Sequence, residues 1–273
     1  MEEAQTQRKT RRRKRCCLIL ILVIVIVVVL AVVLGLGLHK VPDEDFKSTF
    51  MSKCEEKEGY DCEKTWSTFE QAYVGKDPCQ VPPESYQALM EVVPIKPACN
   101  RMMFWSKTKD VVHDFTTKNK CYVTMEDTFV GSLLDGLTWC SKEGSKDTFT
   151  SGCPEWSDCD NNPVRSFWKT ASASFAQAAC GKVSVMLNGS IAAPFSPESM
   201  FASVEIKNLN PAKVQKLEVV LLTGNKISSC SSPSLKNLQR ELPQGIAYGC
   251  KEVPESRIEE CALQPDLPCG SCW

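Results

Sequence analysis

The feature that most constrains this chain is an uninterrupted apolar run near its N-terminus. Leu18–Leu38 contains 21 residues without a charged or polar side chain, and a helix of that length spans the ~30 Å hydrocarbon core of a bilayer. Seven basic residues precede the run within residues 8–15, whereas only His39 and Lys40 follow it directly. The positive-inside rule therefore predicts a cytoplasmic N-terminus and an extracellular C-terminal part.

A cleaved signal peptide is the alternative, but the run is too long and no small-x-small motif ends it. We expect a single-pass type II protein of the cell membrane. Residues 1–17 would be a basic cytoplasmic tail, 18–38 a signal anchor and 39–273 the extracellular domain. The tail suits the anionic inner leaflet of the plasma membrane. Cys16 and Cys17 are palmitoylation candidates, with unmodified cysteine as an equal alternative.

The predicted extracellular part is acidic and rich in cysteine. After residue 38 there are 25 Lys and Arg against 31 Asp and Glu, a net charge of −6, which argues against a nucleic-acid partner. Fourteen cysteines lie in this part, and such a density outside the cell predicts a disulfide framework. The residues alone leave the pairing open.

The pattern of apolar residues changes along the extracellular part. It is mostly helical from Asp45 to about Cys180, with a helix start at Asn162-Pro163, where Asn caps the helix and Pro takes its first position. Short apolar runs then alternate with loops. The predicted strands are Val183–Leu187, Ser203–Ile206, Leu217–Leu222 and Gly245–Cys250, and Ser234–Leu242 is predicted to be helical. Apolar strands with helices between them indicate a parallel sheet, whose ligands bind beyond the carboxyl ends of the strands.

Several kinds of chemistry are disfavoured. His39 abuts the predicted membrane span and His113 stands alone in a helical stretch, where we expect an ordinary helix residue. A histidine zinc site or a Ser-His-Asp triad needs more than this, and we expect no metal site. Cys269 and Cys272 have the spacing of a redox pair, yet no helix follows them, which favours structural bridging. Neither G-x-G-x-x-G nor a P-loop occurs.

Carboxylates and tryptophans remain as candidates. Thr124–Cys140 places Glu126 and Asp135 in an apolar, helix-like run, and a buried carboxylate without a partner is costly. We expect Thr124 to cap this helix in a capping box with Asp127. Nine residues apart on one helix, the two acids would face opposite sides. If both serve one site, the helix must break, with Gly131 as the expected point, and the acids would then repel and share a proton.

Three other candidates have an ordinary structural interpretation when the residues are taken alone. Glu205 would point to solvent from the predicted strand Ser203–Ile206, and Trp105 would pack in the core. Trp168 lies four residues before Ser172 and so shares its helix face, where core packing is again the default.

The motif runs change these expectations. Thr124–Cys140, Cys153–Ser190 and the Phe-x-Ser-Val-Glu run at Phe201–Glu205 closely resemble the ADP-ribosyl cyclase/cyclic ADP-ribose hydrolase family, most of all its membrane-anchored leukocyte ectoenzyme. The likeness runs from about Cys54 to Cys261 in matching order. It implies an α+β fold in which a helical domain (about 45–98 and 123–180) packs on a small α/β domain (about 99–122 and 181–273) with a mostly parallel sheet. Disulfides would staple the two, with a cleft between them.

The resemblance also implies the disulfide pairing. The implied pairs are Cys54–Cys62, Cys79–Cys159, Cys99–Cys180, Cys140–Cys153 and Cys230–Cys250, with Cys261 joined to Cys269 or Cys272. Cys121 and one C-terminal cysteine are then left over. Cys121 could be a free thiol or could cross-link a homodimer. Independently of the family, Asn188-Gly189-Ser190 is the sole glycosylation sequon, so outside the cell we expect a glycan on Asn188.

The activity that the resemblance implies is cleavage of the nicotinamide–ribose bond of NAD or NADP. Glu205 would be the catalytic acid, and Glu126 the second acid, which contacts the nicotinamide amide. The implied substrate-binding residues are Trp105, Trp168, Asp135, Lys107, Ser172, Ser199 and Phe201, where Lys107 replaces the arginine that is common in the family. NAD is then the substrate and no cofactor is expected.

The expected products are ADP-ribose and the calcium-mobilising messenger cyclic ADP-ribose, which the enzyme would also hydrolyse. An acid at position 126 predicts mainly hydrolysis, whereas Met200 and Gly136 depart from the pattern of hydrolase-type members and predict more cyclic product. The competing hypothesis is a non-catalytic, disulfide-rich type II surface receptor. A thiol oxidoreductase, which rests on Cys269 and Cys272 alone, is weaker.

Overall fold

The structure is a computed structural model that describes residues 44–96, 98–225, 227–264 and 271–273. The chain divides into two units, Met1–Pro42 and Asp43–Trp273. The predicted tail and anchor, residues 1–38, lie outside the described residues. In the described ranges, no helix has both the length and the apolar character that a membrane crossing requires.

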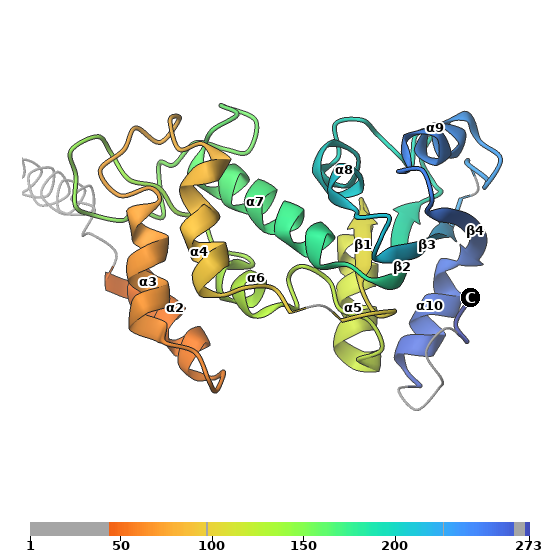
Figure 1. The fold of residues 1–273 in the computed structure, drawn as a ribbon, viewed down its shortest axis with the longest axis horizontal. Helices are drawn as coiled ribbons and strands as arrows, with labels where there is room; N and C mark the ends of the chain where they lie inside the picture. The colour runs from red at the N-terminus through yellow and green to blue at the C-terminus, as the bar shows by residue number, and fades with distance from the viewer. Residues whose placement is uncertain (1–43, 97, 226, 265–270) are drawn as a thin grey trace, which may run out of the picture. The chain divides into compact units, whose positions relative to one another are not determined.

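Helices predominate before β2, apart from the short strand β1, and the other three strands of a parallel sheet follow with further helices (Figure 1). The helices are α2 (Glu44–Glu55), α3 (Cys62–Gln71), η1 (Pro83–Tyr86), α4 (Gln87–Val92), α5 (Lys109–Asn119), α6 (Phe129–Leu134), α7 (Pro163–Ala178), η2 (Phe201–Glu205), α8 (Ile206–Asn208), α9 (Pro233–Glu241) and α10 (Glu255–Ala262). The strands are β1 (Met103–Ser106), β2 (Gly181–Asn188), β3 (Val214–Thr223) and β4 (Ala247–Pro254).

The sheet is fully parallel, as predicted, in the order β1-β2-β3-β4. Val183–Leu187 and Leu217–Leu222 lie inside β2 and β3, and Gly245–Cys250 overlaps the start of β4. The edge strand β1 pairs with β2, with Phe104 opposite Val185 and Trp105 opposite Met186. Figure 1 shows α7 running from the helical part to the sheet. Its start is the predicted one, because Asn162 accepts a hydrogen bond from the backbone of Arg165 at 2.9 Å.

Alternate residues of the central strands feed two separate apolar cores. Val185 and Val219 join the main core, which α9 covers through Leu235. Met186 and Val220 join a second core with residues of α5 and α10. Both faces of the sheet are therefore buried, which is the condition under which strands become continuously apolar.

Six disulfides join described residues. They are Cys54–Cys62, Cys79–Cys159, Cys99–Cys180, Cys140–Cys153, Cys230–Cys250 and Cys261–Cys272. Every pairing that the resemblance implied is confirmed, and Cys261 takes Cys272 of its two predicted partners. Cys121 is also disulfide-bonded, so a free thiol at this position is wrong. Cys272 is bonded to Cys261, which agrees with the structural bridging that the sequence favoured over a redox pair.

One predicted strand is wrong. Ser203–Ile206 belongs to η2, a π-helical turn, and to α8, which follows it directly. Ser199 starts this turn, because its hydroxyl accepts from the backbone N–H of Ala202 at 3.2 Å and its carbonyl accepts from the Ser203 hydroxyl at 2.8 Å. Four alternating residues are too few to distinguish a strand from a helical turn, and local capping decides between them.

The predicted helix around Glu126 and Asp135 is also wrong in its limits. Helix α6 begins at Phe129 with Thr128 as its N-cap, and both acids lie outside it. Thr124 and Asp127 do bond to each other at 2.8 and 2.9 Å, but they close a turn before the helix. Gly131 lies inside α6 and is not a break. A Cβ on Gly131 would stand 2.1 Å from the carbonyl oxygen of Met125, so glycine lets the preceding loop pack against the helix.

A buried carboxylate ties the sheet together. Glu218 on β3 is 2% exposed and forms ion pairs with Lys182 on β2 and, at 3.3 Å, with Lys216. Burial alone would raise the pKa of Glu218, but the hydrogen bonds and positive charges of the two lysines outweigh burial and lower it.

We predict that Glu218→Gln lowers the free energy of unfolding at pH 7 by about 1–2 kcal/mol. Because the pKa of Glu218 is lowered by folding, its contribution is present above the unfolded pKa and is lost as pH falls through the folded pKa. The difference in melting temperature between the wild type and the variant should therefore shrink below about pH 4. Glu241→Gln, at an exposed position of α9, is the control, and a difference that does not change with pH would contradict the prediction.

Candidate active site

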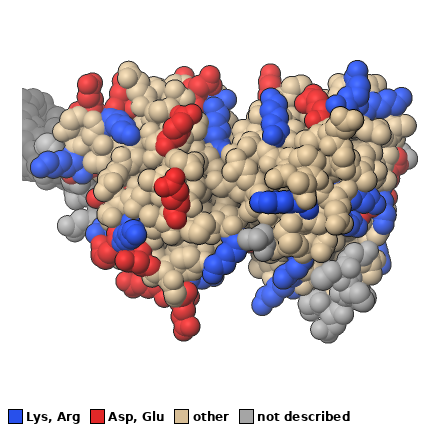
Figure 2. Space-filling model, in the orientation of Figure 1, with Lys and Arg blue, Asp and Glu red and all other residues tan. Residues whose placement is uncertain are grey.

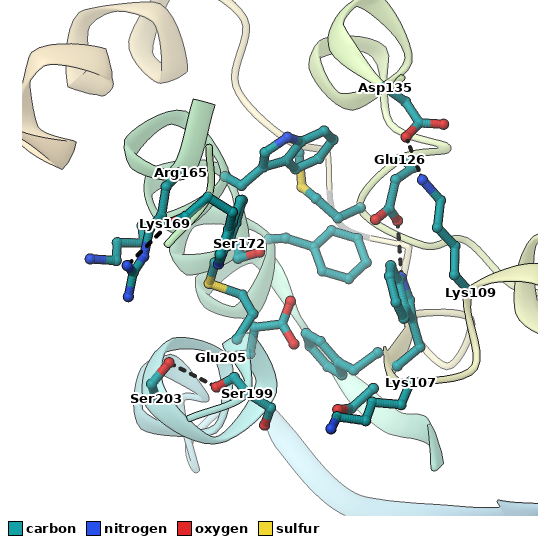
Figure 3. A pocket seen from close by; sticks show the side chains of 18 of the residues that line it. Lys107, Lys109, Glu126, Asp135, Arg165, Lys169, Ser172, Ser199, Ser203 and Glu205 are labelled. Atoms are coloured by element: carbon teal, nitrogen blue, oxygen red, sulfur yellow. Dashed lines mark hydrogen bonds and ion pairs between the residues drawn. The ribbon is translucent and has the colours of Figure 1, made fainter. Parts of the chain in front are cut away.

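A cleft of about 470 Å³ lies along β1. Its walls come from β1, the loop residues on either side of α6, helix α7 and turn η2 (Figure 3). Eight of the nine predicted catalytic and substrate-binding residues line it: Glu205, Glu126, Trp105, Trp168, Asp135, Lys107, Ser172 and Ser199. The cleft extends past the carboxyl end of β1, which is where a parallel sheet binds its ligands.

The ninth predicted residue, Phe201, does not line the cleft. Its side chain is fully buried and packs against Phe104 and Phe195, with ring centroids 5.9 and 6.0 Å away. Phe201 and Glu205 both belong to η2, but the Phe201 ring lies in the core between Phe104 and Phe195, whereas Glu205 lines the cleft. The Phe201 side chain therefore supports η2 from the core, and the role of Phe201 in substrate binding stays a prediction.

Glu205 is the most deeply buried acid of the cleft. Its side chain reaches the cleft from η2, and the residue is 7% exposed. Burial raises the pKa of Glu205 to about 8; a hydrogen bond with the Ser172 side chain opposes this shift, and the negative charge of Glu126 adds to it. A carboxyl group with such a pKa is poised to exchange a proton near neutrality, which is common at catalytic sites.

Two tryptophans come from opposite walls. Trp105 projects from β1 and Trp168 from α7, and both are half-buried. Trp168 lies on the same α7 stripe as Ser172 and Phe175, and all three line the cleft. Phe175 in turn packs edge-on against Phe104 at 5.2 Å. Flat aromatic walls of this kind suit a flat aromatic ligand.

The two acids of the loops beside α6 have different partners. Glu126 accepts a hydrogen bond from the indole Nε1 of Trp105 at 3.2 Å, and His113 Nε2 lies 4.0 Å from the same oxygen. Asp135 pairs with Lys109 at 3.4 Å, and Lys53 donates to its carbonyl oxygen at 3.2 Å. Both acids line one cleft, and their predicted repulsion and shared proton stay a prediction. The acid whose charge raises the pKa of Glu205 is Glu126.

Lys107 ends β1 in a left-handed conformation, with φ of 55°. Its carbonyl oxygen accepts a hydrogen bond from Asn188 Nδ2 at 3.3 Å, which helps to hold a conformation that is uncommon for a residue other than glycine. The partly exposed Asn188 remains a predicted glycosylation site. On the opposite wall, Ser199 donates its hydroxyl to the carbonyl of Ser196 at 2.7 Å.

Sequence reasoning missed several residues of this site. Lys109 and His113 both reach cleft acids from α5, one helical turn apart. Their i, i+4 spacing was the available signal, but it gave no hint of which segment faces α5. Trp156, Arg165 and Lys169 also line the cleft, and the Arg165 guanidinium lies 5.9 Å from the centre of the Trp156 ring.

The fold and the cleft together define a disulfide-stapled α+β protein with a buried carboxyl group between tryptophan walls. The sequence profile described as ADP-ribosyl cyclase matches residues 43–270. The chain belongs to the ADP-ribosyl cyclase family.

Individual relatives agree with this assignment. The rat protein named ADP-ribosyl cyclase/cyclic ADP-ribose hydrolase 1 is 38% identical over 214 residues, which cover 76% of this chain and 71% of the rat protein. The ADP-ribosyl cyclase/cyclic ADP-ribose hydrolase of Aplysia kurodai is 32% identical, over 79% of this chain and 82% of that protein. A structure of porcine CD38 with a covalent intermediate, ribo-F-ribose-5'-phosphate, aligns with a TM-score of 0.72 at 35% identity, over 78% of this chain and 97% of that one.

We predict that Gly131→Ala damages the site through the backbone. The added methyl group would meet the Met125 carbonyl at 2.1 Å and Glu126 Cα at 2.9 Å. The loop must therefore move, at a cost of about 1–3 kcal/mol in unfolding free energy, and Glu126 must shift with it. Thermal melting would measure the loss of stability. The quenching of tryptophan fluorescence by nicotinamide would report the change in the site around Glu126. Ser132→Ala on the same helix is the control, and an equal effect of the two changes would refute the argument.

Proposed function

We propose that this chain is an enzyme that cleaves the nicotinamide–ribose bond of NAD. Its products would be ADP-ribose and cyclic ADP-ribose, and it would also hydrolyse cyclic ADP-ribose. The observation that carries the proposal is the buried carboxyl group of Glu205, whose pKa burial raises to about 8, in a cleft that Trp105 and Trp168 also line. The names of the relatives include the same two activities, cyclase and hydrolase.

The chemistry requires little acid catalysis. The nicotinamide of NAD is a pyridinium, so the electron pair of the C1′–N bond passes to the ring nitrogen and a neutral base leaves. The ribose carbon gains oxocarbenium character, which a carboxylate beside it stabilises by its charge or by forming an ester. Glu205 is the group we assign to this step. The positive charge of the pyridinium favours the ionised carboxylate and lowers the pKa that burial has raised.

The other assignments follow from the walls of the cleft. Trp105 and Trp168 would stack on the nicotinamide ring, which gives about 0.5–1.5 kcal/mol beyond the burial of area. Glu126 would accept a hydrogen bond from the carboxamide. Lys107, Ser172 and Ser199 would hold phosphate or ribose oxygens, with Lys107 giving a single charge where arginine offers two donors.

The partition between products follows from what reaches the ribose carbon. Water gives ADP-ribose, and attack by the adenine gives cyclic ADP-ribose. Glu126 supports mainly hydrolysis, and Met200, which lines the cleft, supports a larger cyclic share. NADP has the same nicotinamide–ribose bond and belongs to the same proposal as a substrate.

The finer architecture and the location are also part of the proposal. The helices before β1 together with α6 and α7 would form one part, and the sheet with α5, α9 and α10 the other, with the cleft between them. The disulfides support an oxidising compartment, and the apolar run Leu18–Leu38 supports a type II membrane anchor. The net charge of −6 after residue 38 supports the absence of a nucleic-acid role. On the face in Figure 2, acidic side chains are more frequent on the left half and basic side chains on the right half.

The direct test is product analysis of the full-length chain with NAD. The wild type should release nicotinamide together with ADP-ribose and cyclic ADP-ribose. Glu205→Gln removes the charge and keeps the shape, so we expect release to fall by at least about 10²-fold.

Glu143→Gln, at an exposed position outside the cleft, is the control and should leave the rate unchanged. Wild-type chain with its disulfides formed that releases no nicotinamide would refute the proposal and favour the non-catalytic receptor.

We also predict a specific pH dependence. The free enzyme must lose the proton of Glu205, whose pKa is about 8, so kcat/KM for NAD should fall about ten-fold per pH unit below that value and level off above it. Because bound NAD lowers this pKa, kcat should keep its plateau to lower pH. Nicotinamide release between pH 5 and 9.5 measures both, and a kcat/KM that is flat over this range would contradict the assignment of Glu205.

A further inference from the structure

We propose that His113 is a positioning residue that holds Glu126 in place and thereby sets the ratio of cyclic to linear product. This inference rests on the proposed function, because it concerns how the same cleft divides its intermediate. It concerns a side chain that the motifs and the mechanism leave without a role.

Helix α5 presents two cationic or ionisable side chains to the cleft acids. Lys109 and His113 are one turn apart, so they share a face of the helix. Lys109 Nζ lies 3.4 Å from Asp135 Oδ1, and His113 Nε2 lies 4.0 Å from Glu126 Oε2. Helix α5 therefore places one side chain near each of the two acids that flank α6. His113 is the side chain near Glu126, the acid whose charge acts on Glu205.

His113 Nε2 lies near Glu126 but, at 4.0 Å, beyond hydrogen-bond distance. His113 Nε2 is buried and has no hydrogen-bond partner among the described residues, and buried polar atoms of this kind are normally satisfied. The Trp105 ring packs edge-on against the imidazole, with centroids 5.6 Å apart and an interplanar angle of 73°. Trp105 Nε1 also donates to the Glu126 oxygen that faces His113. The three side chains thus close a triangle, and a closure of about 1 Å between His113 and Glu126 would complete it.

The charges around His113 favour this contact. From the segment before α6 it faces Glu126, and from β1 it faces Trp105, which carries no charge. On α5 itself, Lys109 and Lys118 are already paired with Asp135 and Asp114. On the side of α10, Glu255 and Glu259 line a separate shallow pocket with Asp110 and Asp114. Glu126 is therefore the carboxylate to which His113 can donate a hydrogen bond.

The consequence for the reaction follows from the role of Glu126. An Nε2–H that donates to this carboxylate keeps it turned toward Trp105, so the nicotinamide carboxamide meets a fixed acceptor and water keeps its access to the ribose carbon. Without the donor, Glu126 is held by Trp105 alone. A looser Glu126 favours attack by the adenine, as loss of the acid itself would.

The test compares His113→Gln, His113→Leu and wild type as full-length chains with NAD at one pH. We expect the ratio of cyclic ADP-ribose to ADP-ribose to rise about three-fold in His113→Leu, the effect of one weak ion pair. In His113→Gln, which keeps a hydrogen-bond donor, the ratio should rise less. Val112→Ala, a buried neighbour on α5, loosens the helix without touching Glu126 and should leave the ratio unchanged.

A double-mutant cycle identifies the route. If His113 acts through Glu126, then His113→Leu added to Glu126→Gln changes the ratio no further. Additive effects, or a ratio that Val112→Ala shifts as much as His113→Leu does, would overturn the inference and leave His113 a packing residue. An inactive wild type would instead refute the proposed function, so the two failures are distinguishable.

Discussion

The pairing of β1 with β2 is the constraint on which the cleft depends. It joins residues about eighty positions apart in the sequence and sets Trp105 opposite Met186. The Cys99–Cys180 disulfide lies just before both strands, and Asn100 Oδ1 accepts from the backbone of Lys182 at 2.9 Å. A slip of one residue would exchange the faces of Phe104 and Trp105. The core would then hold the indole that binds Glu126, so the staple protects the site as well as the fold.

The three acids of the cleft differ in the side chains that surround them. Asp135 has Lys109, and Glu126 has the Trp105 indole with His113 nearby. None of the ion pairs between described residues involves Glu205, and burial raises its pKa. A positively charged substrate stabilises the ionised form of such an acid most, because the described residues form no ion pair with it. Binding of the pyridinium and ionisation of Glu205 are therefore two parts of one event.

Local signals predicted the elements that local chemistry determines. Asn162 and Pro163 predicted the start of α7, and the apolar runs in β2 and β3 predicted a parallel sheet that is covered on both sides. Ser203–Ile206 was predicted as a strand because its alternation is short and the cap at Ser199 lies outside it. His113 was predicted as an ordinary helix residue because nothing in its own helix shows that the Glu126 loop packs beside it. Gly131 lets that loop pack closely against α6. This is a tertiary contact, which the periodicity of the sequence cannot predict.

The residues that depart from the family pattern act on the space around the ribose rather than on the acids. Gly136 lines the cleft with φ of 76°, and nothing lies within 4 Å of where its Cβ would stand. Glycine there leaves the rim open beside Asp135 and leaves Lys109 with a single carboxylate. Met200 brings an apolar, flexible side chain to the wall that carries Glu205. An open rim admits both water and the folded substrate, whereas an apolar wall near the reacting carbon disfavours water. In the proposed reaction, the balance of the two products would therefore depend on Met200 and Glu126, which both line the cleft.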